Sequence, residues 1–282
     1  MFSDIHANEN NLDECTTVIH KSRSQSNQHA PSSKMQKKYR CDTVNIGGFT
    51  LHRIKKERSQ KAFLYFHGGA YVVGPSSLHW PMIDQIVNQS GYEVALFDYP
   101  KAPEFTAEEA IKQSTACYEH LLAEYEPEDI FLMGDSAGAG LAAGLLIHLR
   151  EEEKPQPAQL ILLYPWLDVT MPHSESVILE PKDLLLTVEG LRTCGRLYAG
   201  EKSVTDPLIS PIYGSWEGLP PVQIFTGTED ILHPQAKALK SQLTEAKHPF
   251  NYYQYEKMQH AWMILPIPEA KKAINELVAA VC

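Results

Sequence analysis

Residues 130–144, Ile-Phe-Leu-Met-Gly-Asp-Ser-Ala-Gly-Ala-Gly-Leu-Ala-Ala-Gly, decide the fold of this 282-residue chain. The apolar run 130–133 is typical of a buried strand, and the small residues from Ala139 onward open a helix. Between them, Gly134-Asp135-Ser136-Ala137-Gly138 has the form G-x-S-x-G, whose serine occupies a sharp strand-to-helix turn. Such a turn lifts the hydroxyl clear of the sheet, beside a helix N-terminus that favours negative charge. Ser136 is therefore the candidate nucleophile.

Short apolar runs alternate with helix-like segments on both sides of this turn. Strands are expected at 62–66, 94–97, 130–133, 160–163, 222–225 and 252–255, and helices at about 78–90, 106–124, 139–152, 186–198, 233–247 and 267–281. This alternation indicates an α/β fold with a mostly parallel central sheet, right-handed crossovers and helices on both faces. Residues 39–44 and 49–54 flank Asn45-Ile46-Gly47-Gly48 and predict a hairpin, which gives the sheet an antiparallel start.

Composition indicates a globular protein and excludes several classes of partner. The chain is 43% hydrophobic and 21% charged, with a net charge of -10, which disfavours a nucleic-acid partner. The basic cluster at 34–38 is expected to be a solvated loop. No signal peptide and no membrane-spanning run are recognisable. Five widely spaced cysteines without a CxxC pair argue against a disulfide scaffold and a zinc site, so we expect a cytoplasmic protein. The sequence does not decide between a monomer and a homodimer.

The chain divides into two regions by composition. Residues 1–38 are polar and are expected to be part of a cap or partly disordered, with one short helix around 12–21. Residues 39–282 are expected to form the catalytic domain, with a small helical cap inserted at about 171–200. Apolar residues of this insertion would line a substrate entrance or form buried helix faces; examples are Val177, Ile178, Leu184, Leu185 and Leu186.

A second motif, His67-Gly68-Gly69-Ala70-Tyr71, follows the strand expected at 62–66. A serine that attacks an acyl carbon creates an oxyanion, which needs preorganised hydrogen-bond donors. A glycine pair after a strand can present backbone N–H groups without side-chain obstruction, although a tight turn without such a role is the alternative. We expect His67 to hold this loop and not to act as a base.

With these motifs the chain resembles the hormone-sensitive-lipase-like branch of the α/β-hydrolases over roughly residues 60–265. The resemblance also includes the segments 98–104, 165–168 and 206–211. It implies that the N–H groups of Gly68 and Gly69 form an oxyanion hole. The N–H of Ala137 would join them, which also follows from its place after the nucleophile. Ala70 and Tyr71 are expected to contact the substrate. Ala70 and Ala139 stand where the family usually has glycine.

The general base should be a histidine later in the chain, because α/β-hydrolases order their triad as serine, acid, histidine. Among His148, His173, His233, His248 and His260, the last lies in a loop just past the strand at 252–255. This is the carboxyl edge of the sheet, where ligands bind in open α/β folds. His260 is therefore the candidate base.

Two aspartates follow strands at the same edge and are candidates for the acid. Asp230 comes after the strand at 222–225, and Asp168 comes after the strand at 160–163. The resemblance favours Asp230.

The sequence thus predicts a carboxylesterase-type serine hydrolase for small, short-acyl esters, working without a cofactor or metal. Cleavage of amides or formamides at the same site, as in arylformamidases, is an alternative. A non-catalytic small-ligand receptor is a further alternative, and the presence of His260 counts against it.

Overall fold

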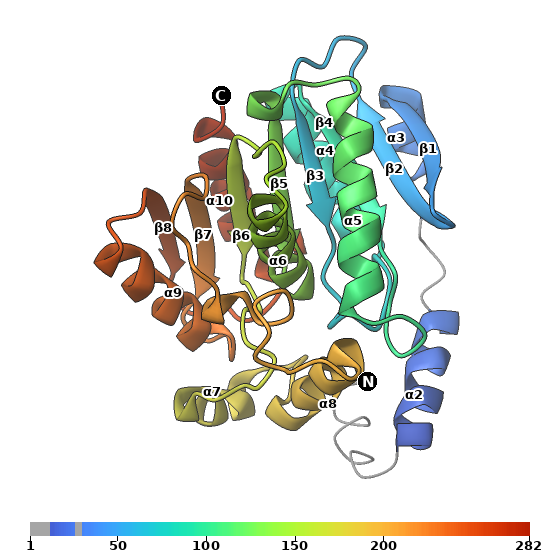
Figure 1. Ribbon diagram of the computed structural model, residues 1–282. Helices are drawn as coiled ribbons and strands as arrows, with labels where there is room; N and C mark the ends of the chain where they lie inside the picture. Colours follow the sequence, from blue (N-terminus) through green and yellow to red (C-terminus); the bar gives the residue numbers. More distant parts are fainter. Residues whose placement is uncertain (1–11, 26–29) are drawn as a thin grey trace.

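The computed structural model describes residues 12–25 and 30–282, and these contain one eight-stranded sheet (Figure 1). Its strands follow the order β1-β2-β4-β3-β5-β6-β7-β8. They are β1 (Arg40–Ile46), β2 (Phe49–Lys55), β3 (Ala62–Phe66), β4 (Glu93–Asp98), β5 (Ile130–Asp135), β6 (Gln159–Leu163), β7 (Val222–Gly227) and β8 (Phe250–Tyr255). The β1–β2 and β2–β4 pairs are antiparallel and the other pairs are parallel, which confirms a mostly parallel sheet with an antiparallel start.

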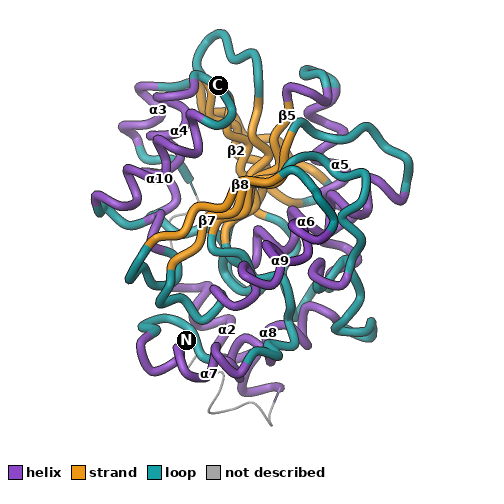
Figure 2. The backbone as a smooth tube through the Cα atoms, turned by 90° about the vertical axis from the view of Figure 1, so that its left-hand side faces the viewer, coloured by secondary structure: helices purple, strands orange, loops and turns teal. Residues whose placement is uncertain are grey.

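Helices cover both faces of the sheet (Figure 2). The described helices are α2 (Leu12–Gln25), α3 (Ser33–Lys38), α4 (His79–Ser90), α5 (Ala107–Leu122), α6 (Ala137–Glu151), α7 (Ser174–Leu179), α8 (Val188–Ala199), α9 (His233–Glu245) and α10 (Pro268–Ala279). One face carries α3, α4 and α10, and the other carries α5, α6 and α9. The expected arrangement is confirmed.

Alternation along the central strands supplies a core on each face. In β3, Leu64 and Phe66 belong to the cluster that packs under α5 and α6, whereas Phe63 and Tyr65 belong to the cluster under α4 and α10. Successive side chains of a strand point to opposite faces. Because both faces are covered, the strand is apolar throughout, as is typical of a parallel sheet.

The cap-like helices gather at one end of the sheet (Figure 1). Helices α7 and α8 fall within the segment 171–200, and α2 includes the helix expected at 12–21. Tyr198 of α8 stacks on Tyr71, in the loop after β3, with ring centroids 3.7 Å apart. This contact places α8 against the carboxyl end of the parallel strands. Within residues 1–38, segments 1–11 and 26–29 lie outside the described residues, so the expectation of partial disorder stays a prediction.

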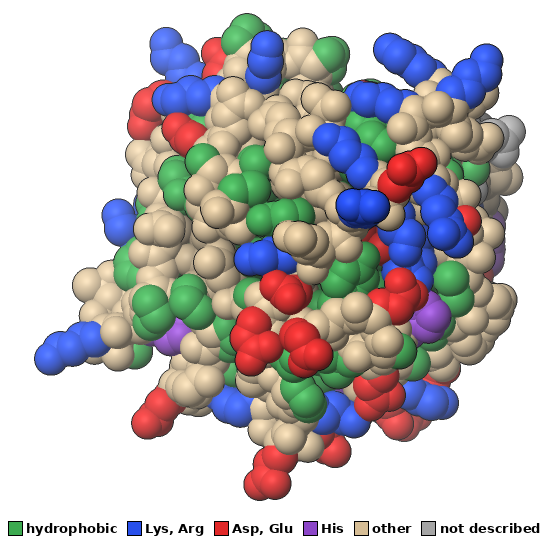
Figure 3. Space-filling view, turned by 90° about the horizontal axis from the view of Figure 1, so that it is seen from above, with side chains coloured by type: hydrophobic (Ala, Val, Ile, Leu, Met, Phe, Trp, Pro, Cys, Tyr) green, Lys and Arg blue, Asp and Glu red, His purple; other side chains and the backbone are tan. Residues whose placement is uncertain are grey.

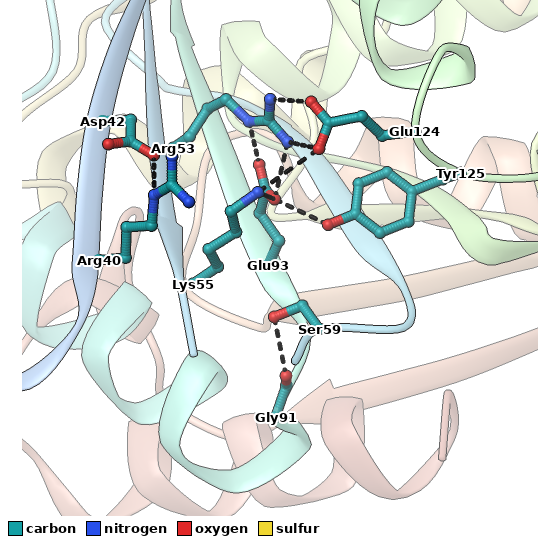
Figure 4. A network of polar contacts seen from close by, with 9 residues as sticks. All are labelled: Arg40, Asp42, Arg53, Lys55, Ser59, Gly91, Glu93, Glu124 and Tyr125. Carbon is teal, nitrogen blue, oxygen red and sulfur yellow. Dashed lines mark hydrogen bonds and ion pairs between the residues drawn. The ribbon is translucent and has the colours of Figure 1, made fainter. Parts of the chain in front are cut away.

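A buried ion-pair network joins the antiparallel hairpin to the parallel part of the sheet (Figure 4). Arg53 of β2 donates from Nε to Oε1 of Glu93 at 2.5 Å, and it also pairs with Glu124 just after α5. The Tyr125 hydroxyl donates to Glu93 at 2.8 Å. Because Glu93 is fully buried, loss of one partner would cost about 3–5 kcal/mol of stability. The network therefore fixes β2 against β4, at the amino end of β4.

The basic cluster at 34–38 lies in a helix, so the expectation of a solvated loop is wrong. Ser32 caps α3 by accepting a hydrogen bond from the Met35 N–H at 3.3 Å, and the Met35 side chain is buried. One buried apolar residue among exposed polar ones is enough to dock a single helical turn. Lys38 pairs with Asp84 of α4 at 2.7 Å. On the end of the molecule away from the cap, lysine and arginine side chains lie among acidic ones (Figure 3).

Candidate active site

Ser136 occupies the turn between β5 and α6. Its φ of 54° and ψ of -121° lie in a region that non-glycine residues rarely adopt, as expected for a strained strand-to-helix turn. A Cβ at Gly138 would collide with the carbonyl of Phe66, and one at Gly134 would collide with the carbonyl of Gly138. Both glycines are therefore required for the helix to approach the neighbouring strand so closely.

The structure brings Ser136, His260 and Asp230 together, although they come from loops after three different strands. His260 Nε2 lies 2.8 Å from Ser136 Oγ, and His260 Nδ1 lies 2.9 Å from Asp230 Oδ2. The other Asp230 oxygen accepts the backbone N–H of Leu232 at 2.8 Å. All three side chains are buried, so these hydrogen bonds are shielded from competition with water.

The environment of His260 shapes its charge. Burial disfavours the protonated ring, but the adjacent Asp230 carboxylate outweighs this effect and raises the pKa of His260.

The carboxylate of Asp168, the alternative acid, bonds to groups other than His260. Its Oδ1 accepts hydrogen bonds from Thr170 and its Oδ2 accepts the hydroxyl of Tyr213 at 2.8 Å. Asp168 is thus part of a local turn and is not the partner of His260.

The loop after β3 does not offer all of the expected oxyanion donors, and the exception is Gly68. The N–H of Gly68 donates to Oδ1 of Asp135 at 2.7 Å, so it is not available to an oxyanion. Within residues 12–25 and 30–282, by contrast, no acceptor takes the N–H of Gly69, Ala70 or Ala137. The chain turns at Gly69 and Ala70, with positive φ of 131° and 52°.

Tyr71 does not have the position expected of a substrate contact. Its ring is fully buried, stacked between Trp166 and Tyr198 with centroid distances of 5.3 and 3.7 Å. With a positive φ of 64°, Tyr71 places its side chain in the core under α8, whereas Ala70 lines the site cavity. The sequence could not show this, because the direction of a side chain in a left-handed turn depends on the loop backbone.

A cavity of about 260 Å³ lies above Ser136 and His260. Its walls are mostly apolar and include Ala70, Val73, Leu185, Leu186, Ala261 and Ile264. Leu185 and Leu186 belong to the cap segment, so the cap borders the cavity. Leu185 is itself exposed, as are Val177, Ile178 and Leu184, whereas Leu186 is buried.

His67 anchors the loop that carries the free N–H groups. Its ring is fully buried and stacks on Tyr99 at 4.4 Å, and Nδ1 lies 2.6 Å from the carbonyl oxygen of Gly68. Nε2 lies 3.3 Å from Asp98. Burial lowers the pKa of His67, and these partners offset it only in part. Because His67 contacts neither Ser136 nor Asp230 by any of these bonds, its place fits a holding role.

Arg23 of helix α2 also holds this loop, and sequence reasoning did not identify it. Its Nε donates to the carbonyl of Val72 at 2.6 Å, and its guanidinium also donates to the carbonyl of Ala102. The same group forms an ion pair with Glu104 at 2.7 Å. An N-terminal arginine thus contacts the backbone two residues after Ala70. Its sequence neighbourhood carries no motif, so only the folded chain reveals the contact.

In residues 12–25 and 30–282, no three His, Cys, Asp or Glu side chains are grouped as ligands for a metal ion. No helix in that part of the chain combines the length and apolar character needed to cross a bilayer. The expectation that the protein works without metal or cofactor stays a prediction.

A serine on a strand-to-helix turn, at the carboxyl edge of a mixed sheet and followed in the chain by an aspartate and a histidine, defines the α/β-hydrolase class. The α/β-hydrolase-fold family model matches residues 63–264, which is most of the chain. An acetyl-hydrolase from Streptomyces hygroscopicus is 32% identical over 238 residues, covering 83% of this chain and 80% of that protein. The chain therefore belongs to the α/β-hydrolase family.

Other relatives agree with this assignment. An esterase from Acinetobacter venetianus is 31% identical over 244 residues, covering 83% of this chain and 79% of that protein. A crystal structure of an esterase from the bacterial hormone-sensitive lipase family is 27% identical with a TM-score of 0.84, covering 99% of this chain and 95% of the other. The resemblance to the hormone-sensitive-lipase-like branch is confirmed, and the relatives support a carboxylesterase-type hydrolase.

Proposed function

We propose that this chain hydrolyses short-acyl carboxylic esters through an acyl-enzyme on Ser136. The observation that carries the proposal is the hydrogen-bonded series Ser136–His260–Asp230, with distances of 2.8 and 2.9 Å. Ser136 Oγ attacks the ester carbonyl while His260 Nε2 takes its proton. Asp230 keeps the imidazole in the correct tautomer and stabilises the imidazolium.

The developing oxyanion is bound by the backbone N–H groups of Gly69, Ala70 and Ala137, which have no other acceptor in the described part of the chain. His260 then returns its proton to the leaving alkoxide, which departs as the alcohol. Water attacks the acyl-enzyme by the same route, with His260 again as the base, and releases the carboxylic acid and Ser136.

The preference for short acyl groups is supported by the size of the cavity. Sites for drug-sized ligands measure about 300–1,000 Å³, whereas this cavity has about 260 Å³. Ala70 adds a methyl to its wall where a glycine would leave space. The names of two relatives, an acetyl-hydrolase and an esterase, also support hydrolysis of esters with a short acyl group.

A fluorophosphonate probe tests the proposal directly. Intact-mass and peptide spectrometry should find one adduct, on Ser136, in the folded protein. The Ser136→Ala variant should take up no probe and lose essentially all esterase activity, by about 10⁶-fold in kcat. Unlabelled folded protein, or an alanine variant with more than a few percent of wild-type turnover, would contradict the proposal. A panel of esters, anilides and formamides then separates ester hydrolysis from amidase activity.

A further inference from the structure

Asp135 joins the two loops that carry the proposed oxyanion donors. It is the last residue of β5, directly before Ser136, and its side chain is 2% exposed. Oδ1 accepts the N–H of Gly68 at 2.7 Å and the hydroxyl of Tyr65 at 2.6 Å. Because Gly68 precedes Gly69, this carboxylate ties the loop after β3 to the nucleophile turn.

A second histidine, His79 at the start of α4, faces the same carboxylate. His79 Nδ1 lies 3.0 Å from the backbone N of Ser76 and 3.2 Å from the Ser76 carbonyl oxygen. With the Ser76 N–H donating to Nδ1, the neutral ring carries its proton on Nε2. That atom is inaccessible to water and has no hydrogen-bond partner in the described residues, and it lies 3.6 Å from Asp135 Oδ1. The Nε2–H group of His79 therefore lies close enough to compensate the charge of Asp135.

The charge of Asp135 requires such compensation. Burial opposes ionisation of this carboxyl, but His79 and the hydrogen bonds from Tyr65 and Gly68 outweigh burial and lower its pKa. An uncompensated carboxylate beside Ser136 would repel the developing oxyanion, and the effect is strong where water is excluded. With these donors around it, the Asp135 carboxylate is held in place and accepts the N–H of Gly68 in the loop after β3.

We propose that Asp135 is a positioning residue that aligns the N–H groups of Gly69 and Ala70 with that of Ala137, and that His79 holds Asp135 in place. Neither side chain reacts with the substrate. The inference rests on the proposed function, because it assumes that these three N–H groups bind the oxyanion. It adds a two-residue support, Asp135 and His79, to the hole itself.

Paired substrates can separate an effect on the oxyanion hole from a general loss of structure. The p-nitrophenyl ester of acetic acid and its thionoacetate analogue differ only in the atom that the hole binds, and sulfur is the poorer acceptor. The ratio of their kcat/KM values therefore reports alignment of the donors. A variant that merely loses folded protein lowers both values equally and leaves the ratio unchanged.

The variants are Asp135→Asn, His79→Leu and His79→Gln, with Asp168→Asn as the matched control. Asp168 is also 2% exposed, but within the described residues its carboxylate bonds only to Thr170 and Tyr213. We expect Asp135→Asn to lower kcat for the oxygen ester about 10- to 100-fold, with KM nearly unchanged and a smaller ester-to-thionoester ratio. His79→Leu should act in the same direction, and His79→Gln, which keeps a donor near the Nε2 position, should restore the ratio.

An unchanged ratio in folded Asp135→Asn protein would overturn the inference. If that variant does not fold, the two His79 variants test the inference instead. The same ester-to-thionoester ratio in His79→Leu and in His79→Gln would then overturn it. The proposed function fails in a different way, through activity that survives in Ser136→Ala. The two failures are thus distinguishable.

Discussion

His260 Nδ1 lies 2.9 Å from Oδ2 of Asp230. The two residues come from two loops that are hydrogen-bonded to each other in the protein without substrate. These loops follow β7 and β8, which pair in parallel up to Gly227 and Tyr255. The N–H of Glu229 donates to the carbonyl of Met258 at 3.0 Å, beyond the end of the paired strands. The histidine and its acid are therefore held by sheet pairing that continues into the loops.

This relationship predicts that replacing Asp230 lowers kcat far more than replacing Asp168, although both residues lie at the same edge of the sheet. Asp230→Asn should lower kcat by about 10⁴-fold, because the amide favours the wrong imidazole tautomer. Asp168→Asn should have a far smaller effect, since in the described part of the chain its carboxylate bonds only to Thr170 and Tyr213. Steady-state kinetics on p-nitrophenyl acetate measure both. Reversed results would move the acid to the loop after β6.

The pH dependence of kcat/KM follows from the raised pKa of His260. The ring must be neutral to accept the proton of Ser136, so activity falls as the pH drops through the pKa of His260. Burial lowers that pKa but Asp230 raises it more, which places the acidic limb above the ordinary value of 6.5. In Asp230→Asn the largest raising effect is lost, and burial is opposed only by the weaker effects of Asp183 and Asp135, so the limb of the residual activity should move to lower pH. A limb that stays in place would contradict this electrostatic coupling.

Acyl-chain preference should reflect the small cavity. Activity on p-nitrophenyl esters is expected to be highest from acetate to butyrate and to fall steeply beyond about eight carbons, since one methylene changes discrimination by about 1–3 kcal/mol. Ala70→Gly removes a methyl from the cavity wall and a non-glycine residue from a φ of 52°. It should shift the preference modestly towards longer acyl groups. A wild-type maximum at dodecanoate would contradict the short-acyl proposal.

Helix α2 is predicted to support the loop of the oxyanion donors through Arg23. Arg23→Ala removes the donor to the Val72 carbonyl, a charged hydrogen bond worth about 1.5–3 kcal/mol. We expect kcat on p-nitrophenyl acetate to fall about tenfold or more. Glu104→Gln is the control, because it weakens the ion pair of Arg23 but leaves the bond to Val72 intact. Equal, small effects of both changes would show that the Val72 contact is unimportant.

The sequence predicted those features that depend on short stretches of chain. The turn around Ser136 is recognisable because strand, glycines and helix are contiguous, and the positions of Asp230 and His260 follow from the shared edge of parallel strands. Contacts between distant loops were not predictable. Asp135 accepts from Gly68 across 67 residues, which removes one expected oxyanion donor, and Arg23 contacts Val72 across 49 residues. Such contacts depend on loop conformations that no local pattern specifies.

His260, the proposed base, contacts Ser136 across 124 residues of sequence and follows β8, the edge strand of the sheet. During translation, Ser136 is therefore synthesised well before the proposed base. Under the proposed mechanism, such a nascent chain is chemically inert. The loop 246–249 between α9 and β8 is also a natural place to divide the gene. The larger fragment would keep Ser136 and Asp230 and the smaller one His260, so hydrolysis would report their reassociation.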